Sequence, residues 1–208
     1  MSHNLSEMLR RSSARHDHLC PRQVLGVRMG LAGLAALGLD APVSKQTALV
    51  IVETDGCFAD GIEVATGATI GHRTLRVNDL GKIAATFADV KSRRTIRLSP
   101  STDARQRARI YACDEERHYF AQLQGYQVMP DAELFKFQEI ILDPSLEYLL
   151  SKPNIRVTCD LCREEIINDR QVQAGDLVLC RACARQGYYQ PVHAQVTSYP
   201  FMANSPFN

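Results

Sequence analysis

Four cysteines near the C-terminus constrain the fold of this chain more than any other feature. They form two C-x2-C pairs separated by 17 residues: Cys159, Cys162, Cys180 and Cys183. A tetrahedral zinc ion takes four thiolates, and a C-x2-C turn can place two sulfurs on one metal. The pattern predicts one closed, structural zinc site. Metal binding would supply much of the folding free energy of a segment too short to bury a large core.

The surroundings of the two pairs favour a treble-clef zinc finger over a plain zinc ribbon. The first pair is expected in a turn after a short strand, and the second where a strand runs into the first turn of a helix. Two redox-active or disulfide-forming pairs are an alternative. An iron–sulfur centre is another, although the spacing suits zinc better. Acidic residues interleave with the arginines of this segment, which argues against nucleic-acid binding.

Size and composition predict one ordinary domain with a small appendage. The chain has 208 residues, 45% of them apolar, with 24 Lys and Arg against 23 Asp and Glu. This even balance gives no reason to expect a nucleic-acid or anionic-membrane partner. No apolar run approaches the ~18 residues of a membrane span, and the N-terminus lacks the apolar segment of a signal peptide. With seven cysteines, we therefore expect a reducing, cytoplasmic location.

The linker and the hydrophobic patterns predict a domain of residues 1–150, followed by a finger and an extended aromatic tail in 151–208. The linker is Ser151 to Asn154, and the tail runs from Tyr188 to Phe207. Apolar spacing predicts helices at 5–14, 22–37, 57–66 and 101–124. It predicts strands at 48–53, 75–77, 83–87, 95–98 and 133–142.

Two further predictions concern small residues within the expected helices: three glycines and one cysteine. The expected helix 22–37 contains Gly26, Gly30 and Gly33, each of which lowers helix stability by roughly 1 kcal/mol relative to Ala. We interpret them as sites of close packing between helix and sheet, since GVRMGLAG does not match a dinucleotide-binding fingerprint. Cys113 falls inside the expected helix 101–124 and is predicted to be buried as a small apolar residue.

Cys20 and Cys57 differ from Cys113 because each lies at the start of an expected helix, where backbone amides and the helix dipole stabilise a thiolate. Cys20 follows His16 and His18 in the string HDHLCP. If the two helix starts meet over the end of the 48–53 strand, His18, Cys20 and Cys57 could converge on one metal ion. His16 is a further candidate ligand, and one position would stay open for water or substrate.

Three segments follow one another along the chain: HDHLCP, TDGCFADGIEVATGATIG and NDLGKIAATF. In this order they resemble the motifs of the FmdE family, which takes its name from formylmethanofuran dehydrogenase, over about residues 10–145. The matching positions are His16, His18, Cys20, Pro21, Glu53, Thr54, Asp55, Cys57, Asp60, Gly67, Thr69, Gly71, Asp79, Gly81 and Lys82.

The resemblance implies an α+β core, with helices packed on a mixed or antiparallel sheet. It also implies a homodimer, and some members carry a treble-clef zinc finger after the core. Two positions depart from the family pattern, because Asp17 and Arg22 stand where the family commonly has glycine. Asp17 adds a carboxylate beside the proposed metal, and Arg22 narrows or recharges the mouth of the pocket.

The first functional hypothesis is a metal-dependent core site that binds zinc or iron and acts on a small molecule. His18, Cys20 and Cys57 would be the ligands, with Asp60 as an electrostatic partner and Lys82 as a substrate-binding or general acid–base group. Lys82 could equally be a solvated turn residue. The family name alone suggests a small oxygenated one-carbon or pterin-like substrate.

Two further hypotheses stay open. The chain could be a non-catalytic accessory or assembly protein of a molybdenum or tungsten oxidoreductase. Alternatively, Cys20 and Cys57 could form a reversible disulfide.

Overall fold

The computed structural model describes residues 5–43 and 46–189, and the chain divides into two compact units, 1–149 and 150–208. Most of the aromatic tail predicted from Tyr188 to Phe207 lies outside the described residues. Within the described part, none of the helices combines the length and the apolar character needed to cross a lipid bilayer.

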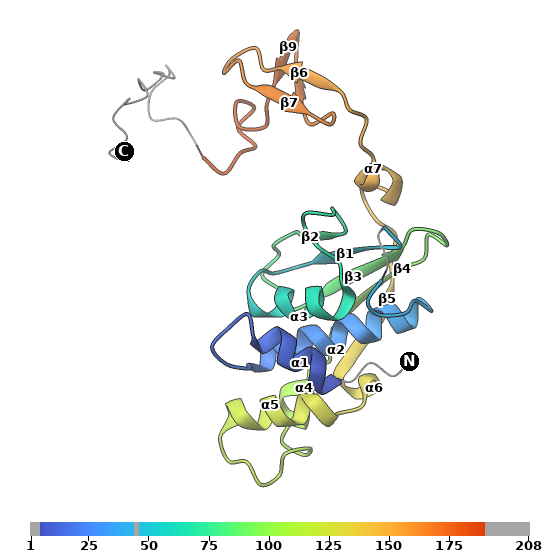
Figure 1. The fold of residues 1–208 in the computed structure, drawn as a ribbon. Helices are drawn as coiled ribbons and strands as arrows, with labels where there is room; N and C mark the ends of the chain where they lie inside the picture. The colour runs from blue at the N-terminus through green and yellow to red at the C-terminus, as the bar shows by residue number, and fades with distance from the viewer. Residues whose placement is uncertain (1–4, 44–45, 190–208) are drawn as a thin grey trace, which may run out of the picture. The chain divides into compact units, whose positions relative to one another are not determined.

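The first unit is built on a five-stranded mixed sheet (Figure 1). Its strands are β1 (Ala48–Val52), β2 (Leu75–Val77), β3 (Ala85–Asp89), β4 (Thr95–Pro100) and β5 (Phe135–Glu139). Their order in the sheet is β2-β1-β3-β4-β5; β1 and β2 run parallel and the other neighbours antiparallel. The predicted α+β class with a mixed sheet is confirmed.

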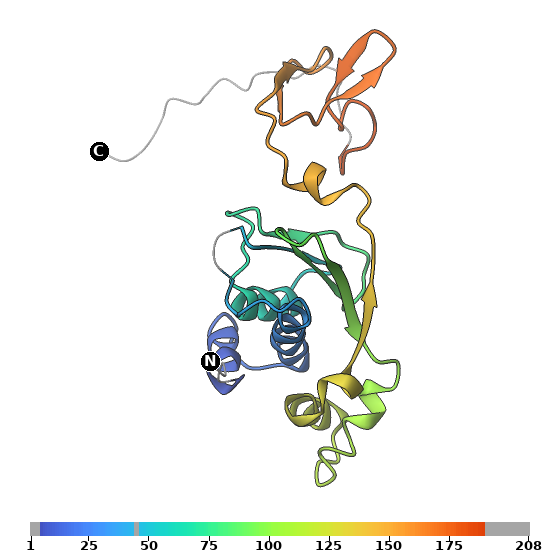
Figure 2. The ribbon, with the colours of Figure 1, turned by 90° about the vertical axis from the view of Figure 1, so that its right-hand side faces the viewer.

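Helices cover one face of this sheet, as Figure 2 shows in side view. The helices of the unit are α1 (Leu5–Ser13), α2 (Pro21–Ala36), α3 (Cys57–Thr66), α4 (Ala104–Arg107), α5 (His118–Val128) and α6 (Asp131–Leu134), and α7 (Leu146–Leu150) follows at its end. Alternate strand residues such as Val50, Val52 and Phe87 are fully buried in the core that these helices complete. This period of two is that of a strand with one face against helices.

A bidentate ion pair joins Glu53, which directly follows β1, to Arg97 of β4. Both positions alternate along the chain with residues that face the core. Glu53 is 6% exposed, and its two oxygens accept bonds of 2.5 and 2.6 Å from Nε and Nη2 of Arg97. Two parallel N–H···O bonds suit the planar guanidinium and satisfy a carboxylate that would otherwise be costly to bury. Glu53, matched to the family motif in the sequence, therefore has a structural partner.

Glycines let α2 and α3 touch through their backbones. A Cβ on Gly26 would lie 2.2 Å from the carbonyl oxygen of Phe58, and one on Gly61 would lie 2.6 Å from that of Gln23. Gly33 instead faces the ring of Phe87 on β3. The prediction of helix-to-sheet packing thus holds for Gly33. It is wrong for Gly26 and Gly30, which both pack α2 against α3.

The predicted helix 101–124 is wrong, because the chain forms the short helix α4, a series of turns, and then α5. The turns include the charged stretch Asp114 to Arg117, where the amide of Arg117 donates to the Glu115 carboxylate and not to a helical carbonyl. Cys113 lies in these turns and is exposed, which corrects the prediction that it is buried.

The second unit is a small zinc-finger fold made of two β-hairpins and a hydrogen-bonded turn. Its strands are β6 (Arg156–Thr158), β7 (Glu165–Ile167), β8 (Val172–Ala174) and β9 (Leu177–Leu179). β6 pairs with β7 and β8 with β9, both antiparallel. After β9, the amide of Ala184 donates to the carbonyl of Cys180 at 2.9 Å, which closes one helical turn.

Candidate metal centres

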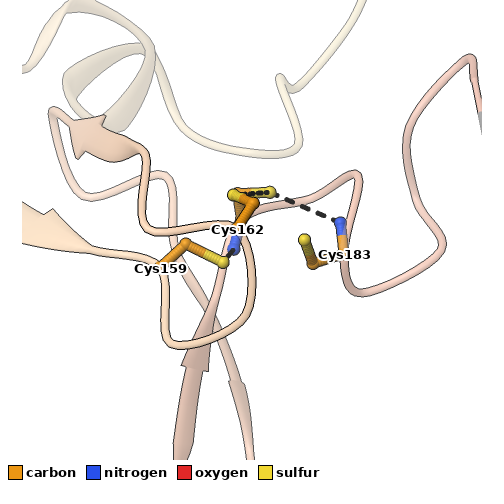
Figure 3. Close-up of side chains that lie close together, drawn as sticks. Cys159, Cys162 and Cys183 are labelled. Atoms are coloured by element: carbon orange, nitrogen blue, oxygen red, sulfur yellow. Dashed lines mark hydrogen bonds between the residues drawn. The ribbon is translucent and has the colours of Figure 1, made fainter. Parts of the chain in front are cut away.

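The two C-x2-C pairs meet at one point of the second unit (Figure 3). The four sulfurs of Cys159, Cys162, Cys180 and Cys183 all lie within 4.8 Å of one another. Backbone amides point at them: that of Cys180 donates to Sγ of Cys159 at 3.2 Å, and that of Cys183 to Sγ of Cys180 at 3.4 Å. The arrangement fits one tetrahedral metal ion with four thiolate ligands and no open position.

The electrostatics of this cluster call for a cation. Burial raises the pKa of the Cys159 thiol, but hydrogen bonds from the backbone amides of Cys162, Cys180 and Leu161 outweigh it and hold the pKa at about 6. Burial and the neighbouring sulfurs raise the pKa of Cys183 to about 12. Four thiols this close do not all ionise by themselves, whereas a divalent metal favours the thiolate form of each ligand.

Cys20 and Cys57 come together in the first unit, although they are far apart in the sequence. Cys20 caps the N-terminus of α2, where its Sγ accepts the amide of Gln23 at 3.4 Å while Gln23 Oε1 accepts the amide of Cys20 at 2.8 Å. Cys57 is the first residue of α3, after Gly56 with φ 74°. Because α2 and α3 are in backbone contact one to two turns further on, their N-termini bring the two thiols within interaction distance.

The pKa of Cys57 is raised, first by burial and then by its interaction with Cys20. The backbone amide at the start of α3 acts in the opposite direction but is the smaller influence. The backbone amide thus favours the thiolate of Cys57 in the direction expected from the sequence, but burial and Cys20 outweigh it. A positive partner would favour the thiolate form of Cys57 over its protonated form.

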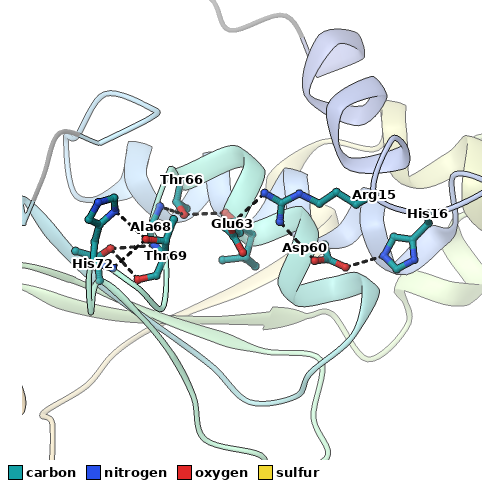
Figure 4. Close-up of polar contacts among 10 residues, drawn as sticks. Arg15, His16, Asp60, Glu63, Thr66, Ala68, Thr69 and His72 are labelled. Carbon is teal, nitrogen blue, oxygen red and sulfur yellow. Dashed lines mark hydrogen bonds and ion pairs between the residues drawn. The ribbon is translucent and has the colours of Figure 1, made fainter. Parts of the chain in front are cut away.

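His16 and Asp60 pair with each other in a network along α3 (Figure 4). His16 Nε2 lies 2.6 Å from Asp60 Oδ2, and Arg15 reaches Asp60 at 3.5 Å and Glu63 at 3.1 Å. This network ties the loop before α2 to the first two turns of α3. Asp60 thus holds His16 and Arg15, one helical turn after Cys57.

The second half of the family motif builds the turn after α3, also seen in Figure 4. Gly67 ends the helix with φ 70°, a value that favours glycine. Thr66 Oγ1 donates to the Ile62 carbonyl at 2.7 Å, and Thr69 Oγ1 lies 2.9 Å from Nδ1 of His72. These motif residues shape the connection from α3 to β2.

A cavity of about 500 Å³ opens beside Cys20. His18, Cys20 and Arg22 line it from the start of α2, and Tyr119 and Gln122 line it from α5. Burial raises the pKa of Tyr119, and so do the nearby sulfurs of Cys20 and Cys57. The volume is that of a small-molecule pocket.

The other predicted site residues are less closely grouped. His18 is exposed beside Cys20, and Lys82 is exposed in the loop before β3 and does not line the cavity. Among the described residues, the four finger cysteines are the only set of three or more His, Cys, Asp or Glu ligand atoms within 4.8 Å of one another. The structure thus unites Cys20 with Cys57, while the roles of His18, Asp60 and Lys82 stay predictions.

The cavity wall formed by α5 and by Arg105 of α4 was not predicted from the sequence. Tyr119, Gln122 and Tyr126 all line the cavity. They lie three and four residues apart, which places them on one face of a helix. This spacing is visible in the sequence and could have indicated the face of α5 that lines the cavity. The prediction of a single helix over 101–124 does not show where that face begins.

Fold and sites together define a class: a two-unit protein with an α+β core that carries a cysteine pair beside a cavity, followed by a four-cysteine metal-binding finger. The family model described as "FmdE, Molybdenum formylmethanofuran dehydrogenase operon" matches residues 15–136, more than half of the chain. The chain belongs to the FmdE family.

Two known proteins resemble this chain. A probable S-adenosyl-L-methionine-binding protein of Archaeoglobus fulgidus is 40% identical over 97 residues, which are 45% of this chain and 26% of that protein. The matched segment thus spans about a quarter of that relative's length. The crystal structure of a tungsten formylmethanofuran dehydrogenase FmdE-like protein from Syntrophus aciditrophicus superposes with a TM-score of 0.57 at 20% identity. The match covers 91% of this chain and 96% of that chain, and it supports the fold.

Proposed function

We propose that this protein binds a second metal ion, zinc or iron, between Cys20 and Cys57, and uses it to bind or transform a small molecule linked to one-carbon metabolism. The observation that carries the proposal is the convergence of two thiols, from the N-termini of α2 and α3, beside a cavity of about 500 Å³. The finger cysteines would hold the first ion, a structural zinc.

Cys20 and Cys57 are a suitable pair of ligands for such an ion. Two thiolates from Cys20 and Cys57, with His18 as the third ligand, would leave one position open toward the cavity. His18 is exposed and lines the cavity next to Cys20, while His16 already engages Asp60. In this scheme His16 and Asp60 position the loop that carries His18. The bound metal would supply Lewis-acid polarisation of a substrate oxygen.

Metal analysis of the purified full-length protein tests the proposal. We expect two ions per chain in the wild type and one in a Cys20→Ser, Cys57→Ser double variant. Cys113→Ser is the matched control, because Cys113 is an exposed cysteine outside both candidate sites. It should keep both ions. A wild type with one ion, unchanged in the double variant, would exclude the core metal.

Individual substitutions then assign the ligands. His18→Ala should weaken binding of the core ion, whereas His16→Ala should have a smaller effect, since it removes only the pairing with Asp60. If His16→Ala releases the metal and His18→Ala does not, the assignment of the third ligand is reversed. Lys82→Ala leaves the metal in place if Lys82 acts on substrate.

An accessory role is the second candidate function. It is favoured by the Archaeoglobus fulgidus relative, in which the matched segment is about a quarter of a longer protein and so lies beside other parts of that chain. Affinity purification from native cells should then recover an oxidoreductase. Recovery of a homodimer alone would support the predicted self-association and count against this role.

The thiol alternative needs its own measurement. Mass spectrometry of alkylated protein, prepared under oxidising and reducing conditions, would reveal a Cys20–Cys57 linked peptide if the pair forms a disulfide. Its absence after oxidation removes this alternative.

A further inference from the structure

The cavity beside Cys20 has two cationic side chains and no acidic one in its wall. Arg22 enters from the first turn of α2 and Arg105 from α4, and the lining residues include no Asp or Glu. A concave site with low-dielectric walls and charge of one sign concentrates ligands of the opposite sign.

These two arginines are not neutralised by the protein. Within the described residues Arg22 forms no hydrogen bond or ion pair, and Arg105 interacts with the phenol of Tyr126 but with no carboxylate. Two buried or half-buried arginines of this unit are paired instead. Arg97 is held by Glu53, and Arg28 donates to Asp131 and to the carbonyls of Tyr126 and Met129. Arg22 and Arg105 therefore bring positive charge into the cavity wall that no carboxylate of the described residues offsets.

The rest of the wall suits the carbon skeleton of a ligand. Leu25 and Ile83 supply apolar surface, and the Tyr119 ring and the Gln122 amide come from α5. Cys20 lies in the same wall, two residues before Arg22 in the sequence. A molecule held by the arginines at one end would present its remaining atoms to the cysteine pair.

We infer that this cavity binds a small organic molecule with a carboxylate or phosphate group, which Arg22 and Arg105 hold while its body reaches the Cys20–Cys57 site. The planar guanidinium fork matches both anions in two-bond geometry. This inference rests on the proposed function, to which it gives a substrate class. It also gives a role to Arg22, which stands where the family commonly has glycine.

Isothermal titration of the full-length protein, purified with its metals, tests the inference with three probes: succinate, inorganic phosphate and the neutral diamide succinamide. We expect one binding site for succinate or phosphate and none for succinamide. The tighter of the two anions indicates whether the natural ligand carries a carboxylate or a phosphate.

Substitutions locate the binding. Arg22→Gln and Arg105→Gln should each weaken the anion at least about tenfold, because each removes a charge-assisted hydrogen-bond donor. Arg109→Gln is the matched control, since Arg109 is exposed in the segment that follows α4 and does not line the cavity. Arg22→Lys keeps the positive charge but not the planar guanidinium group. Its affinity for the anion should therefore lie between those of the wild type and Arg22→Gln. Arg22 is exposed, so its variants are expected to fold, which a thermal melt verifies.

Three results would overturn the inference: no anion binding up to about 10 mM, a range that still detects weak ligands; equal affinity in the Gln variants and the wild type; or succinamide binding as tightly as succinate. The two proposals fail separately. Arginine-dependent binding by a wild type that has no core metal refutes the metal site alone. Core metal without arginine dependence refutes the anion site alone.

Discussion

Replacing Gly61 with alanine should push α2 and α3 apart. The new Cβ would lie 2.6 Å from the Gln23 carbonyl oxygen, 2.8 Å from the Val27 nitrogen and 3.0 Å from the Gly26 Cα. All three atoms belong to the backbone of α2, so no side-chain rotation relieves the overlap. The helices must separate by roughly half an ångström or more, because protein interiors are closely packed and leave no free space for the added carbon.

The net cost follows from two opposing contributions. Overpacking in a core costs about 1–3 kcal/mol, and contact with rigid backbone places this case at the upper end. Alanine in a helix recovers about 1 kcal/mol relative to glycine. We therefore expect a net loss of about 2 kcal/mol, which lowers Tm by roughly 4–8 °C in a unit of this size.

The same displacement should reach the thiols. Cys20 and Cys57 lie at the ends of these two helices, so separating the helices increases the distance between the sulfurs. Affinity for the core metal should fall about tenfold or more, as when the support of a metal ligand is disturbed. The finger metal should stay bound.

Thermal denaturation and metal analysis together measure both effects. Gly71→Ala is the matched control, because no atom lies within 4 Å of the added Cβ. It should change stability by less than about 0.5 kcal/mol. If Gly61→Ala is as stable as Gly71→Ala and retains the core metal, close contact between the helices does not position the cysteine pair.

Three further predictions concern other parts of the chain. Cys180→Ser should release one metal ion and increase amide hydrogen exchange throughout β6–β9 while leaving the thermal transition of the first unit unchanged; a protected finger without metal would contradict a metal-stabilised fold. Arg97→Met leaves the Glu53 carboxylate buried without its partner and should cost about 3 kcal/mol in urea unfolding, and adding Glu53→Gln should recover part of that loss; equal loss in the single and double variants would rule out a penalty from the unpaired charge. Asp89 accepts bonds from the Ser92 hydroxyl and the Lys91 and Ser92 amides, which lower its pKa from 3.8, so its stabilisation is present above that value and is lost as the pH falls through the lowered pKa. Asp89→Asn should destabilise by about 1 kcal/mol at neutral pH, and the difference from wild type should shrink in unfolding measurements in acid; a difference independent of pH would refute this account.

The finger can be predicted from sequence because its ligands are local. Two C-x2-C turns and a short spacer hold all the information needed to place Cys159 with Cys162 and Cys180 with Cys183. The α+β class likewise follows from apolar runs such as Ala48–Val52, which forms β1 and has four of its five residues buried.

The core site depends on a contact that no local pattern specifies. Cys20 and Cys57 meet because Gly26 and Gly61 allow two helices to touch, and the sequence indicates close packing at Gly26 without indicating its partner. The cavity wall of α5 escapes prediction for a related reason. The turns between α4 and α5 are set by side-chain interactions such as that of Glu115, which helical periodicity does not detect.

The capping role of Cys20 links the chemistry of its sulfur to a reporter elsewhere in the backbone. The sulfur that would take a metal or a substrate also accepts the amide proton of Gln23, and Gln23 is fully buried and donates from its side chain to the Ser12 carbonyl in α1. Any change in the charge or coordination of that sulfur alters the environment of one amide proton sheltered from solvent. The NMR resonance of the Gln23 amide is therefore a built-in indicator of the state of Cys20, readable without a label on the thiol itself.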